Sequence, residues 1–485
     1  MRILQISTSD MGGGAEKVAW NLFQAYRQRG HHSWLAVGAK RSDDAEVFVI
    51  PNREPRGRWS RFWWAVHTRL GTLAEQIPGA WHLSRLTRAL SAPGRLLDRY
   101  RGLEDSRFPG TWHLLELHPH PPDVVHCHNL HGGYFDLRAL PWLSHQLPVI
   151  LTLHDAWLLS GHCAHSFECD RWTTGCGDCP DLSIYPSIRR DATAYNWRRK
   201  QAIYTQSRFY VATPSRWLMR KVDQSMLKVA VAEGRVIPNG VDLASFHPGD
   251  KKEARAVLNI PEEARMLLFA ANGIRRNPWK DYRTLRTAIA LVAEHLYGQH
   301  VIFVALGDDA PAETIGRAEV RFVPYQKDPS AVASYYQAAD VYTHAALADT
   351  FPNTVLEALA CGSPIVATAV GGVVEQVKGL WIPDSPSQHP LLNKCVIEEA
   401  TGVLVPAGDA ESMAASIARM LKNEPLRRQL GANAARDAEN RFDLRRQADQ
   451  YLAWYQDIVD DWCTRRSLRQ PAAIQGGLDA LPDAE

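Results

Sequence analysis

Two carboxylates eight positions apart form the strongest chemical signal in the sequence. Asp349 and Glu357 lie in the segment ADTFPNTVLEALACG, residues 348–362. A strand is predicted to end before Asp349, and a helix to start near Asn353 and stop at Gly362. Carboxylates accept hydrogen bonds from vicinal hydroxyls, and a helix N-terminus suits a phosphate. The segment therefore fits a nucleotide sugar, but helix-dipole and turn roles for the two carboxylates fit it equally well.

A glycine run near the amino end is a second candidate ligand contact. Gly12, Gly13 and Gly14 lie between a predicted strand and a predicted helix. Without side chains the backbone can approach a phosphate or a sugar, and the free N–H groups of the following helix can bind an anion. A tight turn without a ligand explains the run equally well.

Half of the eight cysteines fall between residues 163 and 179, in the order C-x5-C-x6-C-x2-C. They are Cys163, Cys169, Cys176 and Cys179. Four such thiolates can hold a structural tetrahedral zinc ion, with His162 and His165 as substitute ligands. Disulfides in an oxidised chain, or unligated thiols, are the alternatives.

Residues 53–107 are strongly basic and aromatic. They contain eleven Arg and five acidic residues, and four aromatic residues fall within 56–69: Trp59, Phe62, Trp63 and Trp64. A basic, aromatic helix can lie on an anionic membrane surface, which would suit a lipid-linked acceptor. A helical insertion whose tryptophans pack on the amino-terminal domain is the alternative. Three nearby histidines fit structural roles better than a metal site: His126, His128 and His131.

Repeated strand–turn–helix units must position these groups. A first series has an apolar helical face over residues 15–29 and strands predicted at residues 2–7, 34–37, 124–126, 149–153 and 211–213. A second series has a helix over residues 281–295 and strands predicted at residues 266–270, 301–305, 320–323, 340–343 and 364–367. Such repeats indicate two doubly wound α/β domains, and ligands of these sheets bind at the carboxyl ends of the strands. A cleft between the domains is the expected site.

Composition excludes several classes of protein. The chain has 485 residues, 45% apolar and 22% charged, so wholesale disorder is excluded. Its 55 Lys+Arg against 53 Asp+Glu give a net charge of +2, which gives no reason to expect nucleic acid as a partner. Eight cysteines are too few for a disulfide scaffold. No signal peptide or transmembrane run stands out, so a cytoplasmic protein is expected.

The carboxylate segment, with Gly371-Gly372-x-x-Glu375 after it, resembles glycosyltransferase family 4. The resemblance runs from residue 2 to about residue 465 and includes four further motifs, GGAE at 13–16, DVVH at 123–126, TLHD at 152–155 and PNGVD at 238–242. The stretch after His154, with its cysteines, is similar to enzymes that build exopolysaccharides such as colanic acid. The family implies the GT-B fold: two Rossmann-like domains facing across a cleft, with a C-terminal helix crossing back to the first domain.

The resemblance implies roles residue by residue. Asp349, where the family has a Glu one methylene longer, would contact the donor sugar, and Glu357 would hold the ribose hydroxyls. His154 matches a cleft histidine near the transferred centre. Lys280 matches the diphosphate-binding Lys, although Asp281 replaces the usual Gly. The accompanying Arg is Arg275 or Arg276, and the other implied donor contacts are Gly13, Gly14, Asn353, Gly371, Gly372 and Glu375.

The domain boundary is expected near residues 236–248. The predicted domains are residues 1–240, with an insertion at 53–118 and a Cys-rich segment at 162–181, and residues 241–440. A terminal helix at 441–465 and a disordered tail at 466–485 are expected to follow.

The resemblance implies a retaining hexosyltransferase. It would use a UDP- or GDP-sugar and a growing, lipid-linked acceptor in exopolysaccharide biosynthesis, with no cofactor required for catalysis. Such an enzyme would be cytoplasmic or peripheral on the inner face of the plasma membrane. The alternatives are a catalytically silent GT-B-fold binding subunit and a GT-B-fold nucleotide-sugar epimerase.

Overall fold

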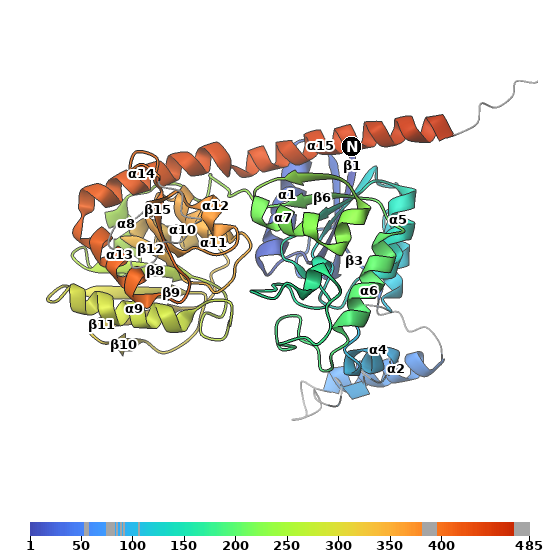
Figure 1. The fold of residues 1–485 in the computed structure, drawn as a ribbon, viewed down its shortest axis with the longest axis horizontal. Coiled ribbons are helices and arrows are strands. Elements are labelled where there is room, and N and C mark those ends of the chain that lie inside the picture. Colours follow the sequence, from blue (N-terminus) through green and yellow to red (C-terminus); the bar gives the residue numbers. More distant parts are fainter. Residues whose placement is uncertain are drawn as a thin grey trace, which may run out of the picture.

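The computed structural model describes residues 1–52, 58–73, 93–104, 107–380 and 395–469, together with residues 83, 86, 87 and 90. Within these ranges, a seven-stranded parallel sheet forms the amino-terminal domain, in the order β3-β2-β1-β4-β5-β6-β7 (Figure 1). Its strands are β1 (Arg2–Ser9), β2 (His32–Ala39), β3 (Val47–Val49), β4 (Val124–His128), β5 (Val149–Thr152), β6 (Phe209–Thr213) and β7 (Val231–Val236).

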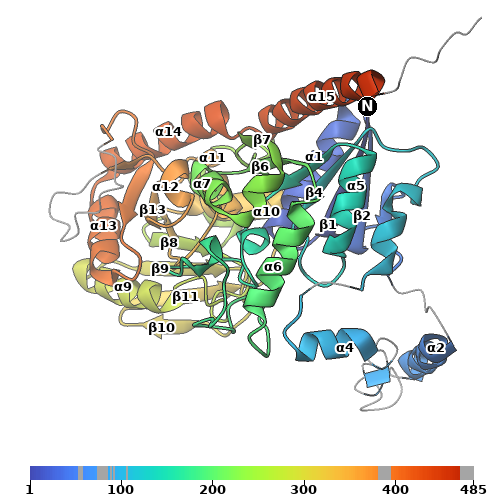
Figure 2. The same cartoon turned by 45° about the vertical axis from the view of Figure 1, so that its right-hand side comes forward.

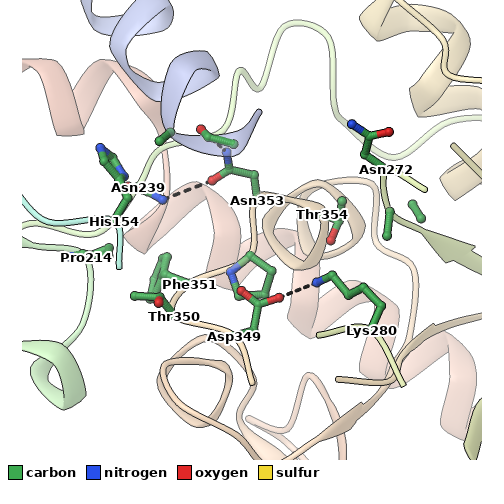
Figure 3. Close-up of a pocket in the computed structure, with 15 residues that line it drawn as sticks. His154, Pro214, Asn239, Asn272, Lys280, Asp349, Thr350, Phe351, Asn353 and Thr354 are labelled. Atoms are coloured by element: carbon green, nitrogen blue, oxygen red, sulfur yellow. Dashed lines mark hydrogen bonds and ion pairs between the residues drawn. The ribbon is translucent and has the colours of Figure 1, made fainter. Parts of the chain in front are cut away.

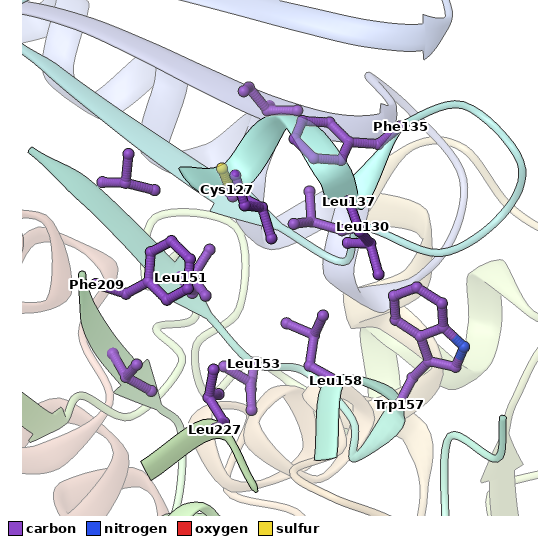
Figure 4. Close-up of a cluster of buried hydrophobic side chains, with 14 of the residues drawn as sticks. Cys127, Leu130, Phe135, Leu137, Leu151, Leu153, Trp157, Leu158, Phe209 and Leu227 are labelled. Atoms are coloured by element: carbon purple, nitrogen blue, oxygen red, sulfur yellow. The ribbon is translucent and has the colours of Figure 1, made fainter. Parts of the chain in front are cut away.

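Helices cover both faces of this sheet, because its strands are apolar on both sides. They are α1 (Gly14–Gln28), α5 (Leu140–Gln146), α6 (Thr193–Tyr204) and α7 (Arg216–Gln224). One core lies on one face, where Leu151 and Phe209 of neighbouring strands pack with Trp157 (Figure 4). Helices α2 (Arg58–Leu73) and α4 (Pro93–Tyr100) stand apart from this body (Figures 1 and 2). Short 3-10 helices fill several connections, at Pro109–Glu116, Leu137–Ala139, Trp157–Leu159, Arg171–Thr173 and Met226–Ala230.

The second domain is built on an eight-stranded sheet among the described residues, in the order β10-β11-β9-β8-β12-β13-β15-β14. Its strands are parallel except β10, which runs antiparallel to β11. They are β8 (Arg265–Ala270), β9 (Val301–Leu306), β10 (Glu313–Ile315), β11 (Ala318–Val323), β12 (Val341–His344), β13 (Ile365–Thr368), β14 (Gly379–Leu380) and β15 (Gly402–Val405).

Helices again cover both faces of the second sheet. They are α8 (Lys251–Val257), α9 (Tyr282–His295), α10 (Pro329–Ala338), α11 (Asn353–Ala360), α12 (Val373–Gln376), α13 (Ala410–Lys422) and α14 (Glu424–Arg441). One core packs Leu268 and Tyr342 against α11, and the other packs Phe303 against α9 and α13. Two buried faces explain why the central strands are continuous apolar runs rather than alternating ones.

The last helix, α15 (Leu444–Arg469), crosses back to the amino-terminal domain (Figure 1). Its Tyr451, Trp454 and Tyr455 are fully buried against α1 and the first sheet. The crossing leaves little room at Gly240 in the linker, where an added Cβ would lie 2.5 Å from the Cα of Leu444. The predicted crossing helix and the two doubly wound domains are therefore confirmed.

Some boundaries and elements differ from the predictions. Helix α15 includes residues 466–469, which were expected in the tail, and residues 470–485 lie outside the described residues. Strands β3, β7, β10, β14 and β15 were not predicted. They are short or lie toward a sheet edge, where the apolar signal is weak. The predicted insertion contains α2 and α4, and residues 53–57 within it also lie outside the described part. No helix of the described chain is long and apolar enough to cross a bilayer.

Candidate functional site

A pocket of about 290 Å³ opens between the two domains, at the carboxyl edges of both sheets (Figure 3). The amino-terminal domain contributes residues that follow β1, β5 and β6, and the second domain contributes residues that follow β8 and β12. This volume is near the lower end of the range for small-molecule sites. The lining residues are Gly14, Ala15, His154, Pro214, Asn239, Ala270, Ala271, Asn272, Lys280 and residues 349–354.

Asp349 and Lys280 form an ion pair inside this pocket (Figure 3). The Nε2 atom of His344 lies 3.3 Å from Oδ2 of the same carboxylate. Burial opposes ionisation of Asp349, but the Lys280 ammonium and the bond from His344 outweigh it, so the pKa of Asp349 lies well below its usual range. The pocket thus holds a carboxylate that stays ionised at neutral pH, beside a cation that can meet a phosphate.

The backbone that carries Asp349 rests on two glycines. Gly371 has φ +48°, and a Cβ there would lie 1.9 Å from the carbonyl oxygen of Asp349. At Gly372 a Cβ would lie 2.0 Å from the carbonyl oxygen of Thr350. Neither glycine lines the pocket. Their close packing positions the Asp349 loop, and the direct donor contact implied by the resemblance stays a prediction.

Asn353, at the start of α11, joins both domains. Its Nδ2 donates to the carbonyl oxygen of Gly14 (3.1 Å), and its Oδ1 accepts from Nδ2 of Asn239 (3.1 Å; Figure 3). Gly14 lies in the glycine turn and Asn239 in the interdomain linker. Gly13 does not line the pocket. It is the N-cap residue of α1, and a Cβ added there would lie 2.6 Å from Oε2 of Glu16. Of the glycine run, the structure brings Gly14 into the site.

His154 follows β5 and faces the pocket from the amino-terminal domain. Its Nε2 lies 3.0 Å from Nδ1 of His128, whose Nε2 lies 3.0 Å from Oε1 of Gln5. Burial lowers the pKa of His154 to about 4, so the imidazole is neutral at pH 7. A neutral imidazole can exchange hydrogen bonds with a sugar hydroxyl.

The other two histidines of this region are also satisfied by hydrogen bonds. His126 contacts Oγ1 of Thr152 (2.6 Å), and His131 contacts Oδ2 of Asp155 (2.7 Å). Burial lowers the pKa of His126 to about 3. These contacts agree with the predicted structural roles.

Glu357 lies outside the main pocket. It lines a smaller cavity of about 60 Å³, which also touches Asn353. Its Oε1 accepts from Nζ of Lys17 (2.6 Å), across the domain interface, and its Oε2 accepts from the hydroxyl of Tyr336 (2.9 Å). A ligand that used this buried carboxylate would have to share or displace these two partners.

The two candidate diphosphate arginines do not line the pocket. Arg275 is directed to Asp308, which accepts from its backbone N–H (3.0 Å) and from its Nε (3.2 Å). Arg276 has an exposed side chain. Lys280 is thus the cation of this loop that the structure brings into the pocket.

Glu375 contacts the amino-terminal domain, and its implied donor contact stays a prediction. Its carboxylate accepts from the backbone N–H groups of Arg216 (2.8 Å) and Trp217 (2.7 Å), the first residues of α7 in the other domain. Free N–H groups at a helix start favour an anion, and Glu375 supplies it. Glu375 therefore bridges the domains in this structure and does not line the donor pocket.

The four clustered cysteines are free thiols. Burial raises the pKa of Cys163 and of Cys176 to about 11, so both are protonated at neutral pH. Cys179 Sγ lies 3.4 Å from Nε2 of His162. Within the described ranges, no three His, Cys, Asp or Glu side chains are placed to hold a metal ion. The placed side chains therefore do not support the zinc interpretation, which stays a prediction.

The Cys-rich segment does reach the cleft. The ring of Phe167 stacks on Trp279, the residue before Lys280, with ring centroids 5.2 Å apart. His165 stacks on Trp217, with centroids 5.4 Å apart. The segment therefore packs against the loop that carries the pocket cation.

Sequence reasoning missed three residues that contact the predicted carboxylates. His344 ends a buried strand five positions before Asp349, and a polar residue at a strand's carboxyl end was a usable signal. Lys17 lies in the first turn after the glycine run, where a cation is unusual because the helix N-terminus is already positive. Tyr336 carried no such signal.

Solved structures of similar fold span nearly the whole chain. Sucrose-phosphate synthase from Thermosynechococcus elongatus superposes with a TM-score of 0.57 at 19% identity, over 95% of this chain and 99% of that one. HepE from Anabaena, solved in complex with UDP and glucose, also gives 0.57, at 17% identity over 94% and 99%. At such low identity the likeness establishes the fold, which is GT-B.

Curated relatives align over about half of their own length. D-inositol 3-phosphate glycosyltransferase from Saccharomonospora viridis is 32% identical over 240 residues, which is 46% of this chain and 50% of that protein. The putative colanic acid biosynthesis glycosyl transferase WcaC of Escherichia coli K12 is 25% identical over 261 residues, 51% of this chain and 60% of that protein.

Two family models cover both domains. The model described as Glycosyltransferase Family 4 matches residues 12–245, and the model described as Glycosyl transferases group 1 matches residues 264–423. The first match ends within the interdomain linker, and the second begins just before β8. Together they include Gly14, His154, Lys280 and Asp349. The chain therefore contains a Glycosyltransferase Family 4 domain followed by a Glycosyl transferases group 1 domain.

Proposed function

We propose that the protein is a retaining glycosyltransferase. It transfers a hexose-type sugar from a UDP- or GDP-sugar to a growing, lipid-linked polysaccharide acceptor at the inner face of the plasma membrane. The observation that carries the proposal is the Lys280–Asp349 pair beside the neutral His154, in one pocket between the domains. A sugar diphosphate needs a cation for its phosphates and hydrogen-bonding groups for its hydroxyls. Lys280 supplies the cation, and the carboxylate of Asp349 and the neutral imidazole of His154 supply the hydrogen-bonding groups.

The donor fits this pocket by charge. Lys280 would leave Asp349 in part to contact the diphosphate, where it would stabilise the negative charge that develops as the glycosyl–phosphate bond breaks. Asp349, freed on that side and still bonded to His344, would accept hydrogen bonds from the sugar. His154 would contact the sugar from the opposite domain, so closure of the two domains would complete the site.

A front-face reaction suits these groups. The bond from the sugar's anomeric carbon to the phosphate oxygen breaks, and the acceptor hydroxyl oxygen bonds to the same face of that carbon. The acceptor's proton passes to the departing phosphate. Among the described residues that line the pocket, Asp349 is the one carboxylate, and its proposed role is to accept hydrogen bonds from the donor sugar rather than to attack the anomeric carbon. Retention by this route needs no protein nucleophile and no metal ion.

The similar proteins support the choice of substrates. HepE binds UDP and glucose, as its solved complex states, which supports a UDP-sugar donor. WcaC is assigned to colanic acid biosynthesis, which supports an exopolysaccharide acceptor.

The test is transfer from candidate UDP- and GDP-sugars to a lipid-linked oligosaccharide, with the product anomer read by NMR. Retention and release of one nucleoside diphosphate per sugar are expected. Lys280→Ala should slow turnover about 10- to 100-fold, because a hydrogen bond to a charged group contributes about 1.5–3 kcal/mol. Lys327→Ala, at an exposed lysine, is the matched control. An inverted product would contradict the mechanism, and donor binding without turnover of any acceptor would favour a silent binding subunit.

A further inference from the structure

Large apolar side chains are exposed to solvent on the two helices that stand apart from the first domain. The exposed fractions are 58% for Trp59 and 60% for Phe62 on α2, and 41% for Leu96 and 55% for Leu97 on α4. Single exposed apolar residues are ordinary, but several gathered on neighbouring elements mark an interaction surface. We call these two helices the α2–α4 surface.

Exposed arginines share this surface. On α2, Arg58, Phe62 and Ala65 are exposed and follow the i, i+4, i+7 spacing of one helical stripe, with Trp59 and Arg61 on either side of it. The sequence of α2 contains no Asp or Glu. Cations and aromatic rings therefore point to solvent from the same face of the helix.

Helix α4 adds to the same charge pattern. Arg99 is exposed, whereas the one acidic residue of α4, Asp98, is buried and paired with Nε of Arg107 at 2.5 Å. The exposed part of both helices therefore combines positive charge with apolar area. That combination fits an anionic bilayer, whose headgroups attract arginine and whose interface accepts tryptophan, phenylalanine and leucine.

The α2–α4 surface is tied to the acceptor side of the cleft. Its segment leaves the sheet after β3, at the same edge from which the loops with Gly14 and His154 leave. After α4, Glu104 is buried: its Oε1 accepts from Nε1 of Trp157 (2.7 Å), and its Oε2 pairs with Nζ of Lys200 (2.8 Å). Trp157 lies three residues after His154. The α2–α4 surface therefore belongs to a connection that leaves the same carboxyl edge of the sheet as the loop with His154. Figure 2 shows the two helices standing apart from the rest of the amino-terminal domain.

We propose that the α2–α4 surface docks on an anionic lipid bilayer and presents a lipid-linked acceptor to the interdomain pocket. The location of the acceptor rests on the proposed function, whereas the docking itself rests on the exposed residues alone. The helices lie in the interface plane, with Trp59, Phe62, Leu96 and Leu97 among the headgroups and the arginines on the lipid phosphates.

The test is co-sedimentation of the full chain with vesicles of phosphatidylcholine alone, or with about one phosphatidylglycerol in three lipids. Binding is expected to the anionic vesicles and to weaken steeply at high salt, since the attraction is screened. Replacing Arg58, Arg61 and Arg99 by Gln should weaken vesicle binding about a hundredfold. Each arginine is expected to contribute about fivefold, and the three factors multiply. Trp59→Ser with Phe62→Ser should also weaken it.

A matched control removes the same residue types elsewhere. Tyr297 is 74% exposed in the second domain, and the guanidinium of Arg317 lies 4.2 Å from its ring centroid. Tyr297→Ser with Arg317→Gln should leave vesicle binding unchanged.

Three outcomes would overturn the docking proposal. They are equal binding to neutral and anionic vesicles, unchanged binding of the arginine variant, and self-association through this surface without lipid, seen by light scattering. Transfer to a soluble acceptor separates the two proposals. If vesicle binding fails while that transfer persists, the docking is wrong and the proposed activity stands.

Discussion

The Nδ1 atom of His128 lies 3.0 Å from the Nε2 atom of His154. On its other side, His128 Nε2 lies 3.0 Å from the amide oxygen of Gln5, which can only accept. His128 therefore carries its proton on Nε2 and accepts at Nδ1 from Nε2–H of His154. The remaining nitrogen of His154, Nδ1, is then an acceptor.

This chain predicts the tautomer of His154. Nitrogen-15 NMR at pH 7 should show His154 neutral and protonated at Nε2, because its pKa is about 4. His128→Leu removes the acceptor and should lower turnover about fivefold, with a mixture of His154 tautomers, since a lost hydrogen bond contributes about 1 kcal/mol. Protonation of His154 at Nδ1 in the unaltered protein would contradict the arrangement.

Gly371 should tolerate no side chain, because a Cβ would meet the carbonyl oxygen of Asp349 at 1.9 Å. Gly371→Ala should shift the Asp349 loop, lower the melting temperature and weaken donor binding at least tenfold. Gly298 offers a control with similar backbone strain, since its φ is +81° and no atom lies within 4 Å of an added Cβ. Gly298→Ala should cost about 1–2 kcal/mol of stability and leave donor affinity unchanged.

Glu375 should act between the domains. Glu375→Ala leaves two N–H groups at the start of α7 without their carboxylate and should lower the free energy of unfolding by about 1–2 kcal/mol. Small-angle scattering should report a larger radius of gyration, because a bridge between the domains is lost. Nucleotide affinity should change less than threefold. A tenfold loss of nucleotide affinity at unchanged stability would instead place Glu375 in the donor site.

Stability should fall in mild acid because of buried histidines. Burial lowers the pKa of His126 to about 3, from an ordinary value of 6.5, so the unfolded chain takes up the proton first as pH decreases. The unfolding free energy should therefore start to fall below about pH 6.5, and at pH 5 His126 alone accounts for about 2 kcal/mol. Urea titrations at pH 7 and pH 5 measure this. His126→Gln should reduce the difference, and His295→Gln, at an exposed site, should not.

Much of the fold was predictable because the central strands are apolar runs and their helices have one apolar face. Gly362 and Asn353 correctly marked the ends of α11, since a glycine stop and a proline before the start are local signals. Interdomain partners were not predictable from local patterns. Lys17 and Glu357 are 340 positions apart, and only the packing of the two domains against each other brings them into contact.

The site residues also divide into those that local sequence patterns predict and those that depend on distant contacts. His154, Lys280 and Asp349 all lie in loops that follow parallel strands, so sheet geometry brings them to the carboxyl edges of their two sheets. Glu375 matched a motif but takes part in a helix cap, because the motif records spacing and not the direction of the side chain. Arg275 does not line the pocket, because it donates hydrogen bonds to Asp308, which lies 33 positions further along the chain.

The central claim is that the pocket containing Lys280 and Asp349 binds a nucleoside diphosphate sugar. Calorimetric titration with UDP-glucose, GDP-mannose and ADP-glucose tests it most directly, with Lys280→Met beside the exposed-site control Lys327→Met. We predict selective binding of one of these sugars, weakened at least tenfold by Lys280→Met and unchanged by Lys327→Met. Equal binding by both variants, or binding of none of the nucleotide sugars, would contradict the account.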